Sequence, residues 1–169
     1  MKNAFEIYPA EEKDIPIIFK FIKQLAEQGN LSHELVATEE ILKESLFGQK
    51  KYAEIIIGYL NQAPVSYALF VHNFSTLFGR PGLYLVDIYV TPEARNKGIG
   101  RNMMVYLAKL ATERKCCRFE WSVLHWNESA INFYKNIGAK EMREWKIYRV
   151  SGEALNKLAG ENLALVKNL

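Results

Sequence analysis

Residues 83–100 read LYLVDIYVTPEARNKGIG, and this stretch decides the fold. Residues 83–90 are apolar on both alternating faces except at Asp87, which predicts a central strand covered on two sides. A polar loop follows Pro92, and from there apolar residues recur at helical spacing, at Ile99, Met103, Leu107, Leu110 and Ala111. A buried strand, a glycine-bearing loop and an amphipathic helix in this order predict an α/β fold.

The sequence on either side supplies further strands and helices. On the N-terminal side, the patterns predict a strand at 5–8, helices at 13–28 and 38–48, and a hairpin of strands at 53–60 and 64–71. On the C-terminal side, they predict a strand at 118–124, a helix from Asn127 to Gly138, and a last strand at 145–150. This order predicts an antiparallel meander followed by at least one right-handed parallel crossover.

The composition is that of one ordinary globular domain. Of the 169 residues, 49% are hydrophobic and 24% are charged, and the net charge is +3. These proportions argue against disorder and coiled coil, and no apolar run approaches the roughly 18 residues of a membrane span. We therefore expect a single domain over residues 1–169 in the cytoplasm, with no membrane partner and no nucleic-acid partner.

Cysteine and histidine are too sparse to suggest a metal site. Cys116 and Cys117 are adjacent, and His33, His72 and His125 each stand without a second ligand at a suitable spacing. We expect no bound metal.

The loop before the predicted helix has the chemistry of an anion site. Gly98 and Gly100 allow a ligand to approach the backbone, while Arg95, Lys97 and Arg101 supply positive charge. The loop lacks the Gly-Lys-Ser/Thr of a Walker loop and the third glycine of a dinucleotide fingerprint. A solvated basic face is the alternative, and phosphate contact is the better interpretation next to the glycines.

Three ordered motifs together resemble the GNAT superfamily of acyl-CoA N-acyltransferases: residues 83–92, the loop at 95–100, and WNESAINFYKNIGA at 126–139. Within it the chain is most similar to the diamine (spermidine/spermine) and thialysine N-acetyltransferase branch. The resemblance implies an α/β (α+β) GNAT fold: a mixed, mostly antiparallel sheet of six or seven strands, splayed at its centre, with helices on both faces.

The resemblance also implies acetyl-CoA as co-substrate and a set of residues that hold it. The pyrophosphate would lie on the loop, the pantetheine arm would pair with the strand like an added strand, and Tyr134 would protonate the departing thiolate. The implied cofactor-binding residues are Ile88, Tyr89, Val90, Arg95, Asn96, Lys97, Gly98, Ile99, Gly100, Arg101, Asn127, Ala130 and Tyr134. By periodicity alone, Tyr134 would be a core aromatic residue.

The chain departs from the diamine branch on the acceptor side. Val86 stands where those enzymes have a glutamate, and Gln28-Gly29 stands where they have a tyrosine-glutamate pair. We therefore expect an acceptor shorter than spermidine or spermine. Candidates to take the amine proton are Asp87, Glu120, Glu144 and His125, and we expect Asp87 and Glu120 to be catalytic together with Tyr134. The expected substrate-binding residues are Glu27, Glu120, Trp121, Ser122 and Glu144.

The expected function is acetyl transfer from acetyl-CoA to a primary amine of a small molecule: a diamine, a lysine-like amino acid or a polyamine. Two alternatives stay open at this point, a protein or peptide N-acetyltransferase and a non-catalytic acyl-CoA-binding sensor. Asp87 could equally be a structural pairing group in the strand. The branch and the apolar tail at 163–166 also suggest a homodimer.

Overall fold

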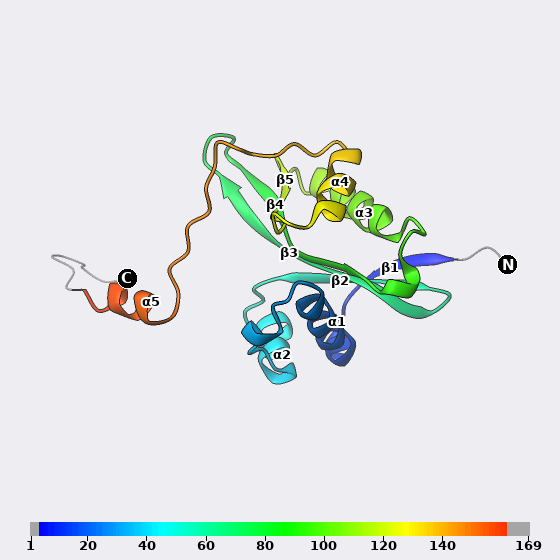
Figure 1. Ribbon diagram of the computed structural model, residues 1–169, viewed down its shortest axis with the longest axis horizontal. Helices are drawn as coiled ribbons and strands as arrows, with labels where there is room; N and C mark the ends of the chain where they lie inside the picture. Colours follow the sequence, from blue (N-terminus) through cyan, green and yellow to red (C-terminus); the bar gives the residue numbers. More distant parts are fainter. Residues whose placement is uncertain (1–3, 162–169) are drawn as a thin grey trace. The chain divides into compact units, whose positions relative to one another are not determined.

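The computed structural model describes residues 4–161, and the chain divides into two units, 1–128 and 129–169. The first unit contains a five-stranded sheet in the order β1-β2-β3-β4-β5 (Figure 1). Neighbouring strands are antiparallel except that β5 runs parallel to β4. The strands are β1 (Phe5–Pro9), β2 (Glu54–Leu60), β3 (Ala63–Ser75), β4 (Arg80–Val90) and β5 (Phe119–Trp121). The antiparallel meander and the parallel crossover are thus confirmed.

Helices cover both faces of this sheet, as expected. Helices α1 (Ile15–Gln28) and α2 (Glu39–Phe47) lie on one side and α3 (Ile99–Glu113) lies on the other (Figure 1). Short 3-10 turns stand at Glu12–Asp14, Ser32–Glu34 and Pro92–Ala94. The side chain of Thr38 accepts a hydrogen bond from the Ile41 amide and begins α2.

The β2–β3 hairpin closes through a two-residue turn. Asn61 and Gln62 have φ angles of 50° and 68°, so both central residues adopt the left-handed conformation of a type I′ turn. Turns of this type match the right-handed twist of the flanking strands. The turn and a shift of register between Gly58 and Tyr59 together set the register of Ile55 and Ile57, which belong to the core cluster under α1.

The register of β4 shifts once, at Val86. Leu69 of β3 faces Asp87, but the next β3 residue, Phe70, faces Leu85, so Val86 has no partner on β3. This is a β-bulge, which turns one residue out of the ladder. The side chain of Val86 is accordingly exposed, whereas its neighbours Leu85 and Asp87 are buried and half-buried, respectively.

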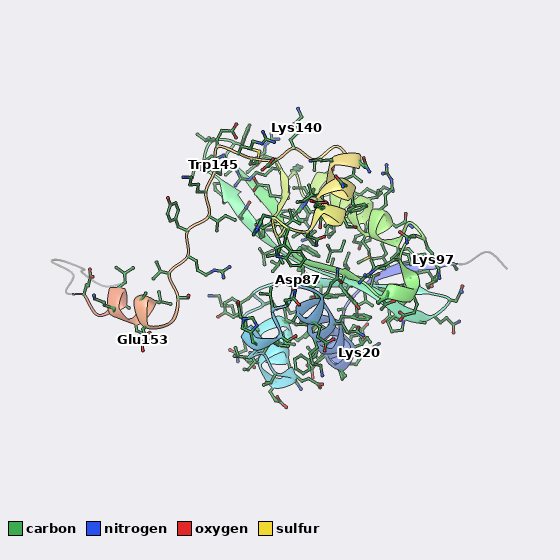
Figure 2. All side chains as sticks on the ribbon, viewed as in Figure 1. Lys20, Asp87, Lys97, Lys140, Trp145 and Glu153 are labelled. Atoms are coloured by element: carbon green, nitrogen blue, oxygen red, sulfur yellow. The ribbon has the colours of Figure 1, made fainter. Side chains whose placement is uncertain are left out.

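Cross-strand partners share a face of the sheet, which fixes where Asp87 points. Tyr67 faces Tyr89 and Leu69 faces Asp87, in two rows of the ladder separated by the row of Ala68 and Ile88, so all four side chains point to the same face. The rings of Tyr67 and Tyr89 pack against Phe21 of α1. Asp87 therefore lies on the face that α1 covers, as Figure 2 shows.

The second unit contains α5 (Gly152–Ala159), and α4 (Glu128–Asn136) begins at the boundary between the units. Two sequence predictions are wrong here. Residues 145–150 form no strand, and the sheet of residues 4–161 has five strands instead of six or seven. Alternation was present, but a strand also needs a partner for its backbone groups, and Trp145, Ile147 and Tyr148 are exposed. The strand expected at 118–124 is confined to Phe119–Trp121, and the patterns did not indicate α5.

Candidate active site

The site begins where β4 loses one of its two neighbours. The parallel pairing of β4 with β5 ends at Leu85 and Trp121, so residues 88–90 are paired only with β3. The Thr91 amide donates to the Val65 carbonyl over 2.9 Å. Hydrogen-bonded and non-hydrogen-bonded pairs alternate in an antiparallel ladder, so the N–H and C=O groups of Val90 and Ile88 point to the open edge. The Val90 carbonyl accepts a hydrogen bond from Arg95 Nε, and an extended ligand could pair with the Val90 amide and with both backbone groups of Ile88.

The loop before α3 has the backbone of an anion cradle. Gly98 has φ +77°, Asn96 has φ +59°, and no atom lies within 4 Å of the position that a Cβ of Gly98 would occupy. The first hydrogen bond of α3 runs from the Asn102 amide to the Gly98 carbonyl, so the amides of residues 99–101 have no helical partner. Unpaired amides at the positive end of a 15-residue helix favour an anion such as phosphate. The backbone of this loop thus has the geometry of an anion-binding site.

The basic side chains of this loop are held in different ways. Lys97, which is labelled in Figure 2, donates from Nζ to the Glu93 carbonyl over 2.8 Å. Arg95 donates from Nε to the Val90 carbonyl over 3.1 Å and from Nη2 to Gln28 Oε1 over 2.7 Å. Its guanidinium also lies 6.0 Å from the centre of the Tyr89 ring. Arg95 therefore ties the end of α1 to the end of β4.

Asp87 is held by a buried tyrosine. The Tyr67 hydroxyl donates a hydrogen bond to Asp87 Oδ2 over 3.2 Å, and the Tyr67 side chain is fully buried. Burial raises the pKa of Asp87, and the hydrogen bond from Tyr67 opposes that shift. The pKa of Tyr67 is also raised, first by burial and then by the Asp87 charge, so Tyr67 keeps its proton. Asp87 is thus a carboxylate that binds a proton more readily than an ordinary aspartate.

Glu120 already has a cationic partner. Its Oε2 lies 2.8 Å from Arg118 Nε and 3.3 Å from the Asn73 side-chain amide, which donates to it. One row further along the same strands, the hydroxyls of Tyr84 and Ser122 lie 2.7 Å apart. Polar side chains from β3, β4 and the segment around β5 thus lie in contact with one another, and the sequence patterns did not predict these contacts.

The other predicted residues differ in exposure. The side chains of Glu27, His125 and Glu144 are exposed, while Trp121, Asn127 and Ala130 are half-buried. Tyr134 lies on α4, where its ring packs 5.4 Å from that of Phe133, and burial raises its pKa. Across residues 4–161, no group of three or more His, Cys, Asp or Glu side chains has the arrangement of a metal site. No helix in the same range is long and apolar enough to span a bilayer.

Sequence reasoning missed the long-range contacts that hold Arg95, Asp87 and Glu120 in place. The contact of Arg95 with Gln28 and that of Asn73 with Glu120 join residues 67 and 47 positions apart. The sequence contains one indication of the role of Tyr67: its hydroxyl lies on an otherwise apolar strand, and a buried hydroxyl needs a hydrogen-bond partner. Only the register of β3 against β4 identifies that partner as Asp87.

Comparison with known proteins identifies the family. The sequence model described as the acetyltransferase (GNAT) family matches residues 20–139. The chain is 36% identical to a thialysine N-epsilon-acetyltransferase of Mus musculus over 165 residues, covering 91% of this chain and 96% of the relative. It is 27% identical to the L-ornithine N5-acetyltransferase NATA1 of Arabidopsis thaliana, covering 91% and 87%. Among solved structures, an integron cassette protein from the mobile metagenome of V. cholerae superposes with a TM-score of 0.79 at 28% identity, covering 93% of this chain and 98% of that one. The chain therefore belongs to the GNAT family and is an acetyltransferase.

Proposed function

We propose that this enzyme transfers an acetyl group from acetyl-CoA to the side-chain amine of a small amino acid or to a short diamine. The observation that carries the proposal is Asp87: a carboxylate of raised pKa, adjacent to the open edge of β4. The similar thialysine and ornithine acetyltransferases support this acceptor class, because both named substrates are amino acids with an amine on the side chain.

The chain has groups suited to hold acetyl-CoA, which would supply the acetyl group as a thioester. The backbone of residues 96–101, with the side chains of Lys97 and Arg101, would bind the pyrophosphate. The outward amides of Ile88 and Val90 would pair with the pantetheine arm, and Asn127 and Ala130 would line its far side. The positive φ at Gly98, the open space beside it and the unpaired amides of α3 all support this assignment.

We assign Asp87 to take the proton of the acceptor amine. A lysine-type amine has a pKa of about 10.4, so releasing its proton at pH 7 costs roughly 4.6 kcal/mol. A base with a raised pKa accepts that proton more readily. Glu120 is less suited to this step because its Oε2 is already in contact with Arg118 Nε at 2.8 Å and with the side-chain amide of Asn73 at 3.3 Å. We therefore keep Glu120 as a substrate-binding residue.

We assign Tyr134 to donate a proton to the thiolate that leaves when the C–S bond breaks. Burial raises the pKa of its hydroxyl, so Tyr134 carries its proton at neutral pH. A hydroxyl that acts in this way typically contributes about 10²- to 10⁴-fold to the rate.

The test measures turnover of acetyl-CoA with thialysine, ornithine, lysine, cadaverine, spermidine and spermine. Release of free thiol reports the rate, and mass spectrometry identifies the acetylated product. We expect the short acceptors to have a kcat/KM at least tenfold above that of spermine. Tyr134→Phe should lower kcat and leave the Kd of acetyl-CoA unchanged, whereas Tyr148→Phe, at an 88% exposed position, should change neither. No turnover with any amine would contradict the proposal.

We also propose that the enzyme is a homodimer, as the branch resemblance suggests. The apolar tail at 163–166, on which the sequence argument also rested, lies outside the described residues. Sedimentation at micromolar concentration tests this proposal, and a monomer would contradict it.

A further inference from the structure

We propose that Arg118 and Glu120 form a subsite for the α-carboxylate and α-ammonium of an amino-acid acceptor. The proposal rests on the proposed function and deepens it by separating amino acids from diamines of equal length. Arg118 would bind the carboxylate, which only the amino acid carries. Glu120 would bind the ammonium group, which both acceptor types carry at the end distant from the reacting amine.

The ladder places this pair on the same face as Asp87. Tyr84 faces Glu120 across the parallel pair of β4 and β5, and Tyr84 also faces Val71 of β3. Asp87 faces Leu69, which lies two residues from Val71 on β3 and so points to the same side. Arg118 precedes Glu120 by two residues and approaches Gly82, the partner of Asn73, from the same side.

The spacing of the rows fits the length of a lysine-type side chain. The row of Glu120 and the row of Asp87 are two residues of β3 apart, about 7 Å at roughly 3.4 Å per residue. The bulge at Val86 brings these rows closer than the three-residue separation of Tyr84 and Asp87 would suggest. Five bonds of about 1.5 Å join the α-carbon of lysine to its side-chain nitrogen, an extended zigzag of roughly 6 Å. An amine at Asp87 would therefore place its α-carbon beside Glu120.

The ion pair also leaves binding capacity for a ligand. The contacts that Arg118 and Asn73 make with the Glu120 carboxylate both use Oε2. Arg118 Nε approaches Oε2 to 2.8 Å but is buried without an aligned hydrogen bond, and within residues 4–161 no contact is seen for the two Nη groups. About a third of each side chain is exposed, 37% for Arg118 and 35% for Glu120. Oε1 and the Nη groups are thus placed for an ammonium and a carboxylate, respectively.

A second ion pair in the same unit, between Arg114 and Glu54, has no carboxylate oxygen left for a ligand. Arg114 binds both carboxylate oxygens of Glu54 through its two Nη groups, and His72 lies beside them. This bidentate arrangement uses the whole planar edge of the guanidinium. Arg114 is therefore a matched control: an arginine in an ion pair on the same sheet, with its partner's oxygens already occupied.

The absence of a side chain at Gly82 and a hydrogen bond from Asn73 set the position of the Arg118 and Glu120 pair. A Cβ on Gly82 would lie 2.3 Å from Asn73 Oδ1 and 3.0 Å from Arg118 Cγ, so only glycine leaves room for both side chains. Asn73 in turn donates to Glu120 and orients its carboxylate. Asn73 is thus a positioning residue for the subsite.

The test compares ornithine with putrescine, and lysine with cadaverine, at saturating acetyl-CoA. Each diamine is its amino acid without the carboxylate. We expect the wild-type enzyme to favour the amino acid by tenfold or more in kcat/KM. Arg118→Met should lower kcat/KM for the amino acids by about 10- to 100-fold, mainly through KM, and change that of the diamines less than twofold. Glu120→Gln should weaken both types of acceptor, and Arg114→Met should leave every ratio unchanged.

Each other result counts against the subsite. An equal loss for amino acids and diamines in Arg118→Met would mean that Arg118 acts only structurally. Arg118→Lys retains the charge, so full loss of the amino-acid preference in a folded, diamine-active Arg118→Lys enzyme would also overturn the proposal. Equal wild-type activity on both acceptor types would overturn the subsite while leaving the proposed function standing. Absence of turnover with any amine would instead refute the proposed function itself.

Discussion

The two halves of β4, separated by the bulge at Val86, have opposite roles. Residues 83–85 are paired with β3 on one side and β5 on the other, and Leu83 and Leu85 are buried. Residues 87–90 are paired on one side only, and their outward backbone groups and Asp87 make up the candidate site. We call residues 83–85 the core half of β4, because they lie at the centre of the sheet. We call residues 87–90 the ligand half, because a ligand could pair with their free edge. The bulge, together with the end of β5 at Trp121, separates the two roles.

The difference also explains why a carboxylate is tolerated in this strand. A buried carboxylate without a partner costs free energy. In the ligand half, Tyr67 satisfies one oxygen of Asp87, and the open edge of β4 begins alongside. A carboxylate in the core half would instead lie between two paired strands, among apolar side chains.

The largest expected effect falls on the ligand half. Asp87→Asn should lower kcat by about 10²- to 10⁴-fold, because the amine proton loses its acceptor. The variant should remain folded and bind acetyl-CoA with unchanged affinity, as measured by calorimetry. A variant with wild-type kcat would assign Asp87 to structure alone.

The stability of Asp87→Asn supplies a second measurement with a defined sign. The pKa of Asp87 is raised in the folded state, so folding favours its protonated form. Its contribution to stability is therefore full below the unfolded pKa near 3.8 and is lost as the pH rises through the higher folded pKa. We expect Asp87→Asn to be at least as stable as wild type at pH 7, with a Tm that varies less across that interval. A clearly lower Tm at pH 7 would contradict this.

The next effect falls on the core half. Leu85 is 2% exposed, so Leu85→Ala should lower the free energy of unfolding by about 2–5 kcal/mol through lost burial and a cavity. Val86→Ala, one residue later at a 48% exposed position, is the matched control and should cost less than about 0.5 kcal/mol. Urea denaturation measures both. Equal losses would mean that the bulge does not divide the strand as described.

A smaller effect on stability is expected at the loop. Gly98→Ala should cost about 1–2 kcal/mol because φ is +77° there, and Gly79→Ala should cost the same, since φ is +61° and no atom lies within 4 Å of either Cβ position. Only the Gly98 variant should also weaken acetyl-CoA binding, and Gly98→Asp should weaken it further by repelling the phosphates. Unchanged affinity in Gly98→Asp would place the phosphates elsewhere.

The smallest effect is expected at the tie between α1 and β4. Gln28→Ala removes one exposed hydrogen bond from Arg95, which should cost about 0.5–1.5 kcal/mol at most. Arg95→Ala removes the bond to the Val90 carbonyl as well and should cost more. Denaturation of both variants checks this order, which the reverse ranking would contradict.

The sequence alone was sufficient for features that depend on neighbouring residues. Periodicity located the strand at 83–90 and the helix after it, and the pair of glycines located the anion loop, because burial pattern and backbone freedom are local properties. The three motifs in order also implied the GNAT family, which the comparisons confirm.

Tertiary structure decided everything that depends on register. It joined Tyr67 to Asp87, Arg95 to Gln28, and Arg118 and Asn73 to Glu120, contacts between residues far apart in the chain. It also corrected the strand expected at 145–150, whose alternation had no partner within residues 4–161. A sequence pattern specifies which side chains prefer burial, but pairing between strands determines which of them meet, and a single bulge at Val86 changes that assignment for every residue beyond it.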